Sequence, residues 1–139
     1  MAQRVREVMT GNPVTLPKDA TVVEAARVMR EQGIGDVIVT DGDRAEGIVT
    51  DRDIVVRAIA EGGNPESVRL EQVESGQLTA VAPDDPVEAA IKIMREQAVR
   101  RVPVVEDGRP VGVVSIGDLA IQRDPGSALA DISEEPPSR

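Results

Sequence analysis

The stretch GIVTDRDI (residues 47–54) ends an apolar run with a hydroxyl, an arginine and two carboxylates. The chain repeats it at 112–119 as GVVSIGDL, where Ser115 stands for Thr50 and Asp118 for Asp53. An apolar run followed by a hydroxyl and, three positions later, an acid predicts a strand that leads directly into a capped helix. On this pattern alone, each hydroxyl–acid pair either caps the helix only or also holds a ligand at the helix N-terminus.

The repeat extends well beyond this stretch. Val8–Asp53 aligns with Val73–Asp118 without a gap, and 15 of the 46 positions are identical. Each copy predicts a short extended segment, a helix, two strands joined by a tight turn, and a second helix. The expected extended segments and strands are 14–16, 37–39 and a strand ending at 50 in the first copy, and 79–81, 102–105 and a strand ending at 115 in the second. The fold class is therefore α+β, with tandem β-α-β-β-α units.

The first helix of each copy carries a start signal. TVVE (21–24) and DPVE (85–88) resemble capping boxes, and Pro86 is expected at the first helical position. Met29 and Met94 lie on the apolar faces of these helices and are interpreted as core residues. DGDRAEG (41–47) resembles part of a calcium loop, but its carboxylates lack the required spacing, so a hairpin turn is preferred.

Composition excludes several functions. The chain has no Cys, no His and no aromatic residue, which removes thiol and histidine catalysis, zinc–thiolate sites and aromatic platforms for nucleic-acid bases. The net charge of −9 disfavours nucleic-acid binding. No apolar run is long enough for a membrane span or a signal peptide, so a cytoplasmic protein is expected. We expect neither a metal site nor enzymatic activity.

The predicted organisation has three parts. Residues 1–63 form the first repeat, residues 64–123 a linker and the second repeat, and residues 124–139 a partly disordered tail. A short connecting helix is expected at 67–73, and a helical turn at 127–132.

REVMTGNPVTLPKDATVVEAARVM and VRRVPVVEDGRPVGVVSIGD together resemble a CBS-domain pair, over residues 4–123. The resemblance implies two repeats packed sheet to sheet about a pseudo-twofold axis, with two clefts between them. It implies no required cofactor, but binding of an adenosine-containing ligand: AMP, ADP, ATP, S-adenosylmethionine or a dinucleotide. It also implies a homodimer.

The candidate site residues come from both copies. Physically, Thr50 or Ser115 can donate to a phosphate oxygen, and Asp53 or Asp118 can accept both ribose hydroxyls. The second copy adds Arg100 and Arg101, a position where the resemblance implies contact with a phosphate. The first copy has Gly35 and the repelling Asp36 there. It adds only Arg52, which faces either the cleft or solvent, and Asp51 is interpreted as a cap.

The resemblance also implies which segments meet in each cleft. Asp118, Ser115 and Arg101 are paired with the segment around Thr10 and Val14, and Asp53 and Thr50 with the segment around Thr79. The Asp118 pocket is expected to be the better nucleotide site.

Three functions compete. The leading hypothesis is a regulatory sensor that binds an adenosine-type ligand and is read by a protein partner that the sequence does not identify. The alternative is a ligand-independent interaction scaffold, which the poorly equipped first pocket fits. A magnesium-dependent nucleotide hydrolase is disfavoured, because the chain has no glycine-rich phosphate loop of the G-x-x-x-x-G-K type.

Overall fold

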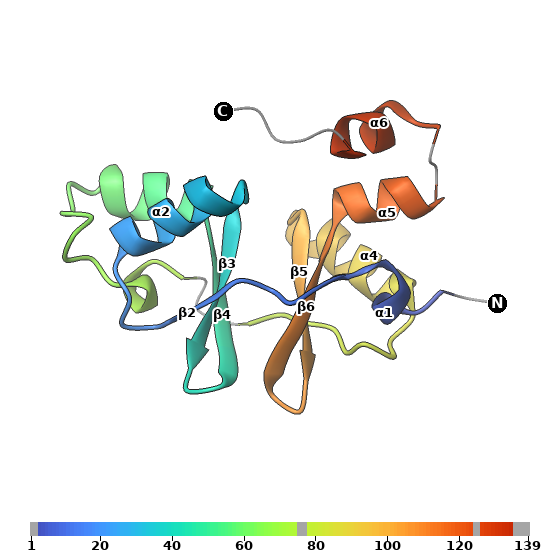
Figure 1. The fold of residues 1–139 in the computed structure, drawn as a ribbon, viewed down its shortest axis with the longest axis horizontal. Coiled ribbons are helices and arrows are strands. Elements are labelled where there is room, and N and C mark those ends of the chain that lie inside the picture. The colour runs from blue at the N-terminus through green and yellow to red at the C-terminus, as the bar shows by residue number, and fades with distance from the viewer. Residues whose placement is uncertain (1–2, 75–77, 124–125, 135–139) are drawn as a thin grey trace. The chain divides into compact units, whose positions relative to one another are not determined.

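The computed structural model describes residues 3–74, 78–123 and 126–134. They form two compact units, each built around one repeat (Figure 1). The first-repeat unit comprises residues 14–78, and the second-repeat unit comprises residues 79–139 together with residues 1–13. The N-terminal segment therefore folds with the second repeat, although it precedes the first repeat in the chain.

The first-repeat unit has the predicted β-α-β-β-α order. Its elements are β2 (Thr15–Pro17), α2 (Val22–Gln32), β3 (Asp36–Asp41), β4 (Arg44–Thr50), α3 (Asp51–Asp53), the π-helix η1 (Ile54–Ile59) and the 3-10 helix η2 (Leu70–Gln72). Strand β3 is central, parallel to β2 and antiparallel to β4. Helix α2 is the crossover that the parallel pair requires.

The second-repeat unit has the same order of a helix, two strands and a helix, and residues 10–11 add a strand to its sheet. Its elements are α1 (Val5–Val8), β1 (Thr10–Gly11), α4 (Val87–Gln97), β5 (Arg101–Glu106), β6 (Arg109–Ser115), α5 (Ile116–Arg123) and α6 (Ala128–Glu134). Strand β6 is central and antiparallel to both β1 and β5. Figure 1 shows the N-terminal segment, in blue, meeting β6. The extended segment expected at 79–81 contributes a single parallel bridge, Val81 to Val104.

The helix starts match the sequence in one repeat and differ in the other. Thr21 caps α2, because its Oγ1 accepts a 3.3 Å hydrogen bond from a backbone N–H of the first turn. The prediction that Pro86 is the first helical residue is wrong: Pro86 is the N-cap, with an extended ψ of 150°, and α4 begins after it. The Asp85 carboxylate accepts instead from the backbone N–H of Ala82 at 2.9 Å, which stabilises the preceding turn.

Both hairpins close through two-residue loops, as predicted. In the second, Asp107 and Gly108 have φ values of 53° and 81°, the two positive angles of a type I′ turn. In the first, Asp41 pairs with Arg44 across the loop. This pairing makes residues 41–44 a hairpin and not the start of a calcium loop.

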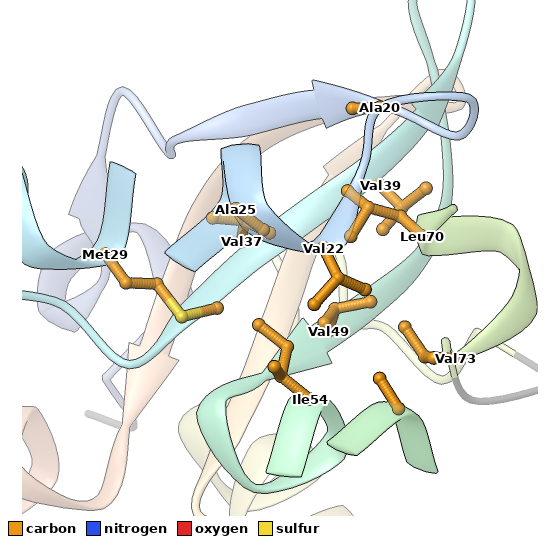
Figure 2. Close-up of a cluster of buried hydrophobic side chains, with 11 residues drawn as sticks. Ala20, Val22, Ala25, Met29, Val37, Val39, Val49, Ile54, Leu70 and Val73 are labelled. Atoms are coloured by element: carbon orange, nitrogen blue, oxygen red, sulfur yellow. The ribbon is translucent and has the colours of Figure 1, made fainter. Parts of the chain in front are cut away.

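Each unit has its own apolar core. Figure 2 shows the core of the first-repeat unit, in which α2, β3, β4 and η2 contribute buried aliphatic side chains. Met29 and Met94 are only 7% and 8% exposed, which confirms that they are core residues. Burial of these periodic faces is the main force that stabilises the elements.

The predicted connecting helix at 67–73 is shorter than expected and is limited to η2. The predicted turn at 127–132 is present as α6, which lies beside α5 (Figure 1) and is capped by Ser127, whose Oγ accepts from the Ala130 N–H at 3.0 Å. The expected disorder of the last residues lies outside the described part. Among the described residues, no helix combines the length and apolar character needed to cross a membrane.

Candidate functional site

The turn from β6 into α5 is fixed by two reciprocal hydrogen bonds. The Asp118 N–H donates to Ser115 Oγ at 3.0 Å, and the Ser115 N–H donates to Asp118 Oδ2 at 3.0 Å. Both side chains therefore cap the helix. The Ser115 hydroxyl proton is not used in this bond, and a carboxylate has about four acceptor positions. Capping is therefore compatible with contacts to a ligand.

A hollow of about 330 Å³ opens beside this turn. It is lined by Arg100, Arg101, Ser115, Ile116, Gly117, Asp118 and Ile121. Strand pairing places Arg101 opposite Ser115, and the Ile116 N–H donates to the Arg100 carbonyl at 2.9 Å. The β5–β6 ladder therefore carries the arginines to the start of α5.

The electrostatics of the hollow suit an anionic ligand that also carries hydroxyls. Two guanidinium groups outnumber the single Asp118 carboxylate, and the N-terminus of α5 adds a partial positive charge. Guanidinium groups bind phosphate through planar pairs of donors. Asp118 offers the acceptor that a sugar diol requires.

The equivalent turn in the first-repeat unit has the same hydrogen bonds but different charges. The Thr50 N–H donates to Asp53 Oδ2 at 2.9 Å, and the Asp53 N–H donates to Thr50 Oγ1 at 3.1 Å. Asp53 also lies 3.8 Å from the Arg57 Nε, an ion pair that competes for its carboxylate. Asp36 is paired with Thr50 across the sheet, where the second repeat has Arg101. This turn is therefore more acidic than its counterpart.

The structure gives the positions of Asp51 and Arg52, the two residues of GIVTDRDI between Thr50 and Asp53. The interpretation of Asp51 as the cap is wrong, because Thr50 is the N-cap and Asp51 is the first helical residue. The Asp51 carboxylate accepts from the adjacent Arg52 N–H at 2.8 Å. The Arg52 side chain is exposed.

The remaining predicted contacts lie on both units. Thr10 is exposed on β1, opposite Val113, in the same unit as Asp118. Val14 belongs to the first-repeat unit, where its carbonyl accepts from the Ile38 N–H at 3.0 Å. Thr79 belongs to the second-repeat unit and accepts from the Gln97 side-chain amide at 3.1 Å. The pairings of Val14 with Asp118 and of Thr79 with Asp53 stay predictions.

The hollow thus brings together four predicted residues, Arg100, Arg101, Ser115 and Asp118. It also includes three that the sequence interpretation missed. Ile116 and Gly117 are the first two residues of α5, and Ile121 lies one turn beyond Gly117 on the same face. Helical spacing from Gly117 was the signal that could have identified Ile121.

Comparison with known proteins identifies the family of both repeats. A family model described as "CBS domain" matches residues 5–59 and 70–122. The "CBS domain-containing protein YhcV" of Bacillus subtilis (strain 168) is 33% identical over 135 residues, which cover 94% of this chain and 96% of that protein. The "Uncharacterized protein MK0525" of Methanopyrus kandleri is 39% identical over 132 residues, which cover 94% of this chain but only 64% of that relative.

Solved structures give the same result. The crystal structure of Hypoxic Response Protein I, which holds two coordinated zinc ions, matches with a TM-score of 0.79 at 31% identity. The match covers 86% of this chain and 98% of that one. Since the family model covers both repeats and relatives match along most of the sequence, the chain belongs to the CBS-domain family.

Proposed function

We propose that this chain is a regulatory module that binds an adenosine-containing ligand in the hollow at the start of α5. CBS-domain proteins are in general regulatory modules, and many bind adenosine ligands. The observation that carries the proposal is the convergence of Arg100, Arg101, Ser115 and Asp118 on one hollow. The conclusion for this chain follows from what these four side chains can bind.

Each part of such a ligand has a complementary group. The phosphates meet the two guanidinium groups and the Ser115 hydroxyl, and the ribose diol meets the Asp118 carboxylate. Ile116, which is 43% exposed, and Ile121 offer an aliphatic surface to the base. Because the chain has no aromatic residue, this surface replaces stacking.

The first-repeat turn is proposed as the weaker site. Thr50 and Asp53 reproduce the hydroxyl and the carboxylate, but Asp36 repels phosphate and Arg57 competes for Asp53. Arg52 is the one cation within residues 50–53. Occupancy of the two turns should therefore differ strongly for phosphorylated ligands and less for adenosine itself.

A thermal-shift series with adenosine, AMP, ADP, ATP, S-adenosylmethionine and NAD tests the proposal. A ligand present at about 100 times its dissociation constant stabilises the folded state by roughly 2.7 kcal/mol. We expect a rise in the melting midpoint with at least one phosphorylated ligand, and its loss in Arg101→Gln. No shift with any of them at millimolar concentration contradicts ligand sensing.

A ligand-independent scaffold is the second candidate, and exposed apolar side chains favour it. Val55, Val56 and Ile59 on η1 are 58%, 43% and 50% exposed. A homodimer that covers them would bury this apolar area. Light scattering of the wild-type chain and of Val55→Ser/Ile59→Ser tests it: a dimer that the double variant converts to a monomer, with no dependence on nucleotide, supports the scaffold.

A further inference from the structure

Two positions of the first-repeat unit have acidic residues where the second-repeat unit has apolar ones. Glu46 and Glu74 in the first repeat correspond, at the repeat offset, to Val111 and Met9 in the second. Met9 and Val111 pack against the apolar core of the second-repeat unit. At the equivalent place the first-repeat unit has two carboxylates.

The side chains of Met9 and Glu74 occupy equivalent places on the sheets of their units. A Cβ on Gly112 would lie 2.7 Å from Met9 Sδ, and a Cβ on Gly47 would lie 2.8 Å from Glu74 Oε2. Glu74 therefore covers Gly47 of β4 as Met9 covers Gly112 of β6. Glu46 is the neighbour of Gly47 and lies at the β-bulge between β3 and β4.

One oxygen of each of these carboxylates is withdrawn from solvent. Within the described part of the chain, Oε2 of Glu46 and Oε2 of Glu74 are both buried without a hydrogen-bond partner. An ionised carboxylate in such a place is costly, and two near one another repel. Burial first, then the charges of Glu46 and Glu71, raise the pKa of Glu74 to about 7, against the opposing effect of Lys18.

The charged groups around Glu74 do not neutralise it. Glu46 on β4 and Glu71 on η2 are acidic. Lys18, after β2, is engaged by the Asp41 carboxylate at 3.2 Å. Arg57 on η1 donates through Nη1 to the Glu74 backbone carbonyl at 3.2 Å, so it contacts the main chain of Glu74 and not the carboxylate.

We propose that Glu46 and Glu74 form a proton-operated latch: with a proton bound, residues 70–74 stay packed on β4, and when both groups are ionised their repulsion loosens this segment. Besides the Arg57 hydrogen bond to the Glu74 carbonyl, the segment is held by the Glu71 N–H, which donates to the Lys18 carbonyl at 3.1 Å. The Leu70 N–H donates to the Ala20 carbonyl at 2.9 Å, and the side chains of Leu70 and Val73 are fully buried. Loosening would expose these two side chains.

The direction of the pH effect follows from linkage. Glu74 binds a proton more tightly in the folded unit, where its pKa is about 7, than in the unfolded chain, where it is 4.5. The folded unit then holds more protons between these two values, so its stability falls as pH rises through this window. Above this window Glu74 is ionised in the folded unit as well, so the latch is open and Glu74 causes no further loss of stability.

The unchanged chain gives the first test. In a ¹³C titration of the glutamate carboxyl carbons, we expect one carboxyl with a midpoint near 7. Amides of residues 70–74 should lose hydrogen-exchange protection between about pH 6 and pH 8, after correction for the intrinsic rate. If every glutamate titrates below about pH 5.5, within the ordinary range, the latch is overturned.

The second test places the residues of the other repeat at these positions. Glu46→Val/Glu74→Met should keep residues 70–74 protected at both pH values. Glu71→Gln keeps both carboxylates of the latch, so it should still lose protection, but at a lower pH, because the Glu71 charge helps to raise the pKa of Glu74. An unchanged pH response in the double variant also overturns the latch. If that variant does not fold, the titration of the unchanged chain decides. Neither test involves nucleotide, so failure here is independent of the proposed ligand site.

Discussion

Replacing Asp118 with Asn separates its observed role in helix capping from its proposed role in ribose recognition. The Asn side-chain oxygen can still accept from the Ser115 N–H, which donates to Asp118 Oδ2 at 3.0 Å in the native chain. The stability cost should stay below about 1 kcal/mol, the typical cost of losing a cap altogether. The charge and the second carboxylate oxygen are lost, so a ribose diol loses its charge-assisted hydrogen bonds. Such bonds contribute about 1.5–3 kcal/mol, which predicts affinity weakened by roughly 10- to 150-fold.

Titration calorimetry with AMP measures the loss of affinity, and thermal unfolding without ligand measures the loss of stability from the altered cap. Asp53→Asn is the matched control, because Asp53 makes the same capping bond at 2.9 Å in the more acidic turn. We expect a similar small stability change in both variants and a large affinity loss only in Asp118→Asn. A well-folded Asp118→Asn chain that binds AMP as tightly as the wild type refutes the ribose assignment.

Other substitutions test the proposed phosphate contact of Arg101 and the conformation of the backbone. Arg101→Gln should weaken ATP binding by roughly tenfold or more while leaving adenosine binding nearly unchanged, as measured by calorimetry at two salt concentrations. Ala98→Gly should stabilise the chain by about 0.5–1 kcal/mol in urea unfolding, because Ala98 ends α4 with a left-handed φ of 54° that costs a non-glycine residue energy. Gly112→Ala should destabilise by about 1–3 kcal/mol, since its Cβ would meet the Thr10 carbonyl at 2.8 Å. Gly47→Ala should cost less, because the group it meets is the end of a flexible side chain; equal costs would contradict the distinction.

Local patterns predicted most of the fold. The hairpin turns and the hydroxyl caps depend on residues a few positions apart, and the structure has the caps at Thr21, Thr50 and Ser115. The partner of the N-terminal segment could not be predicted in this way. Thr10 pairs with Val113, far along the chain, and nothing in the local sequence specifies which repeat a two-residue strand joins.

The second helix of the first repeat shows another limit. Its hydrogen bonds reach five residues back, as from the Ala60 N–H to the Val55 carbonyl at 2.9 Å, which makes η1 a π-helix, whereas the second repeat has the α-helix α5 at this place. Apolar periodicity predicts that a helix forms, but it does not distinguish these two hydrogen-bonding patterns within six residues.

The candidate site depends on the differences between the repeats more than on their identities. Thr50 with Asp53 and Ser115 with Asp118 make the same pair of backbone hydrogen bonds, and these bonds alone are a sufficient reason for the shared residues. The shared motif therefore does not distinguish a helix start from a ligand site. The distinction comes from the preceding strand, where Arg101 faces Ser115 and Asp36 faces Thr50. Exchanging this one position, as Asp36→Arg with Arg101→Asp, should move phosphate-dependent binding from the second turn to the first while both caps remain. Binding that stays at the Asp118 turn after the exchange would mean that the cap residues, and not the strand residues, select the ligand.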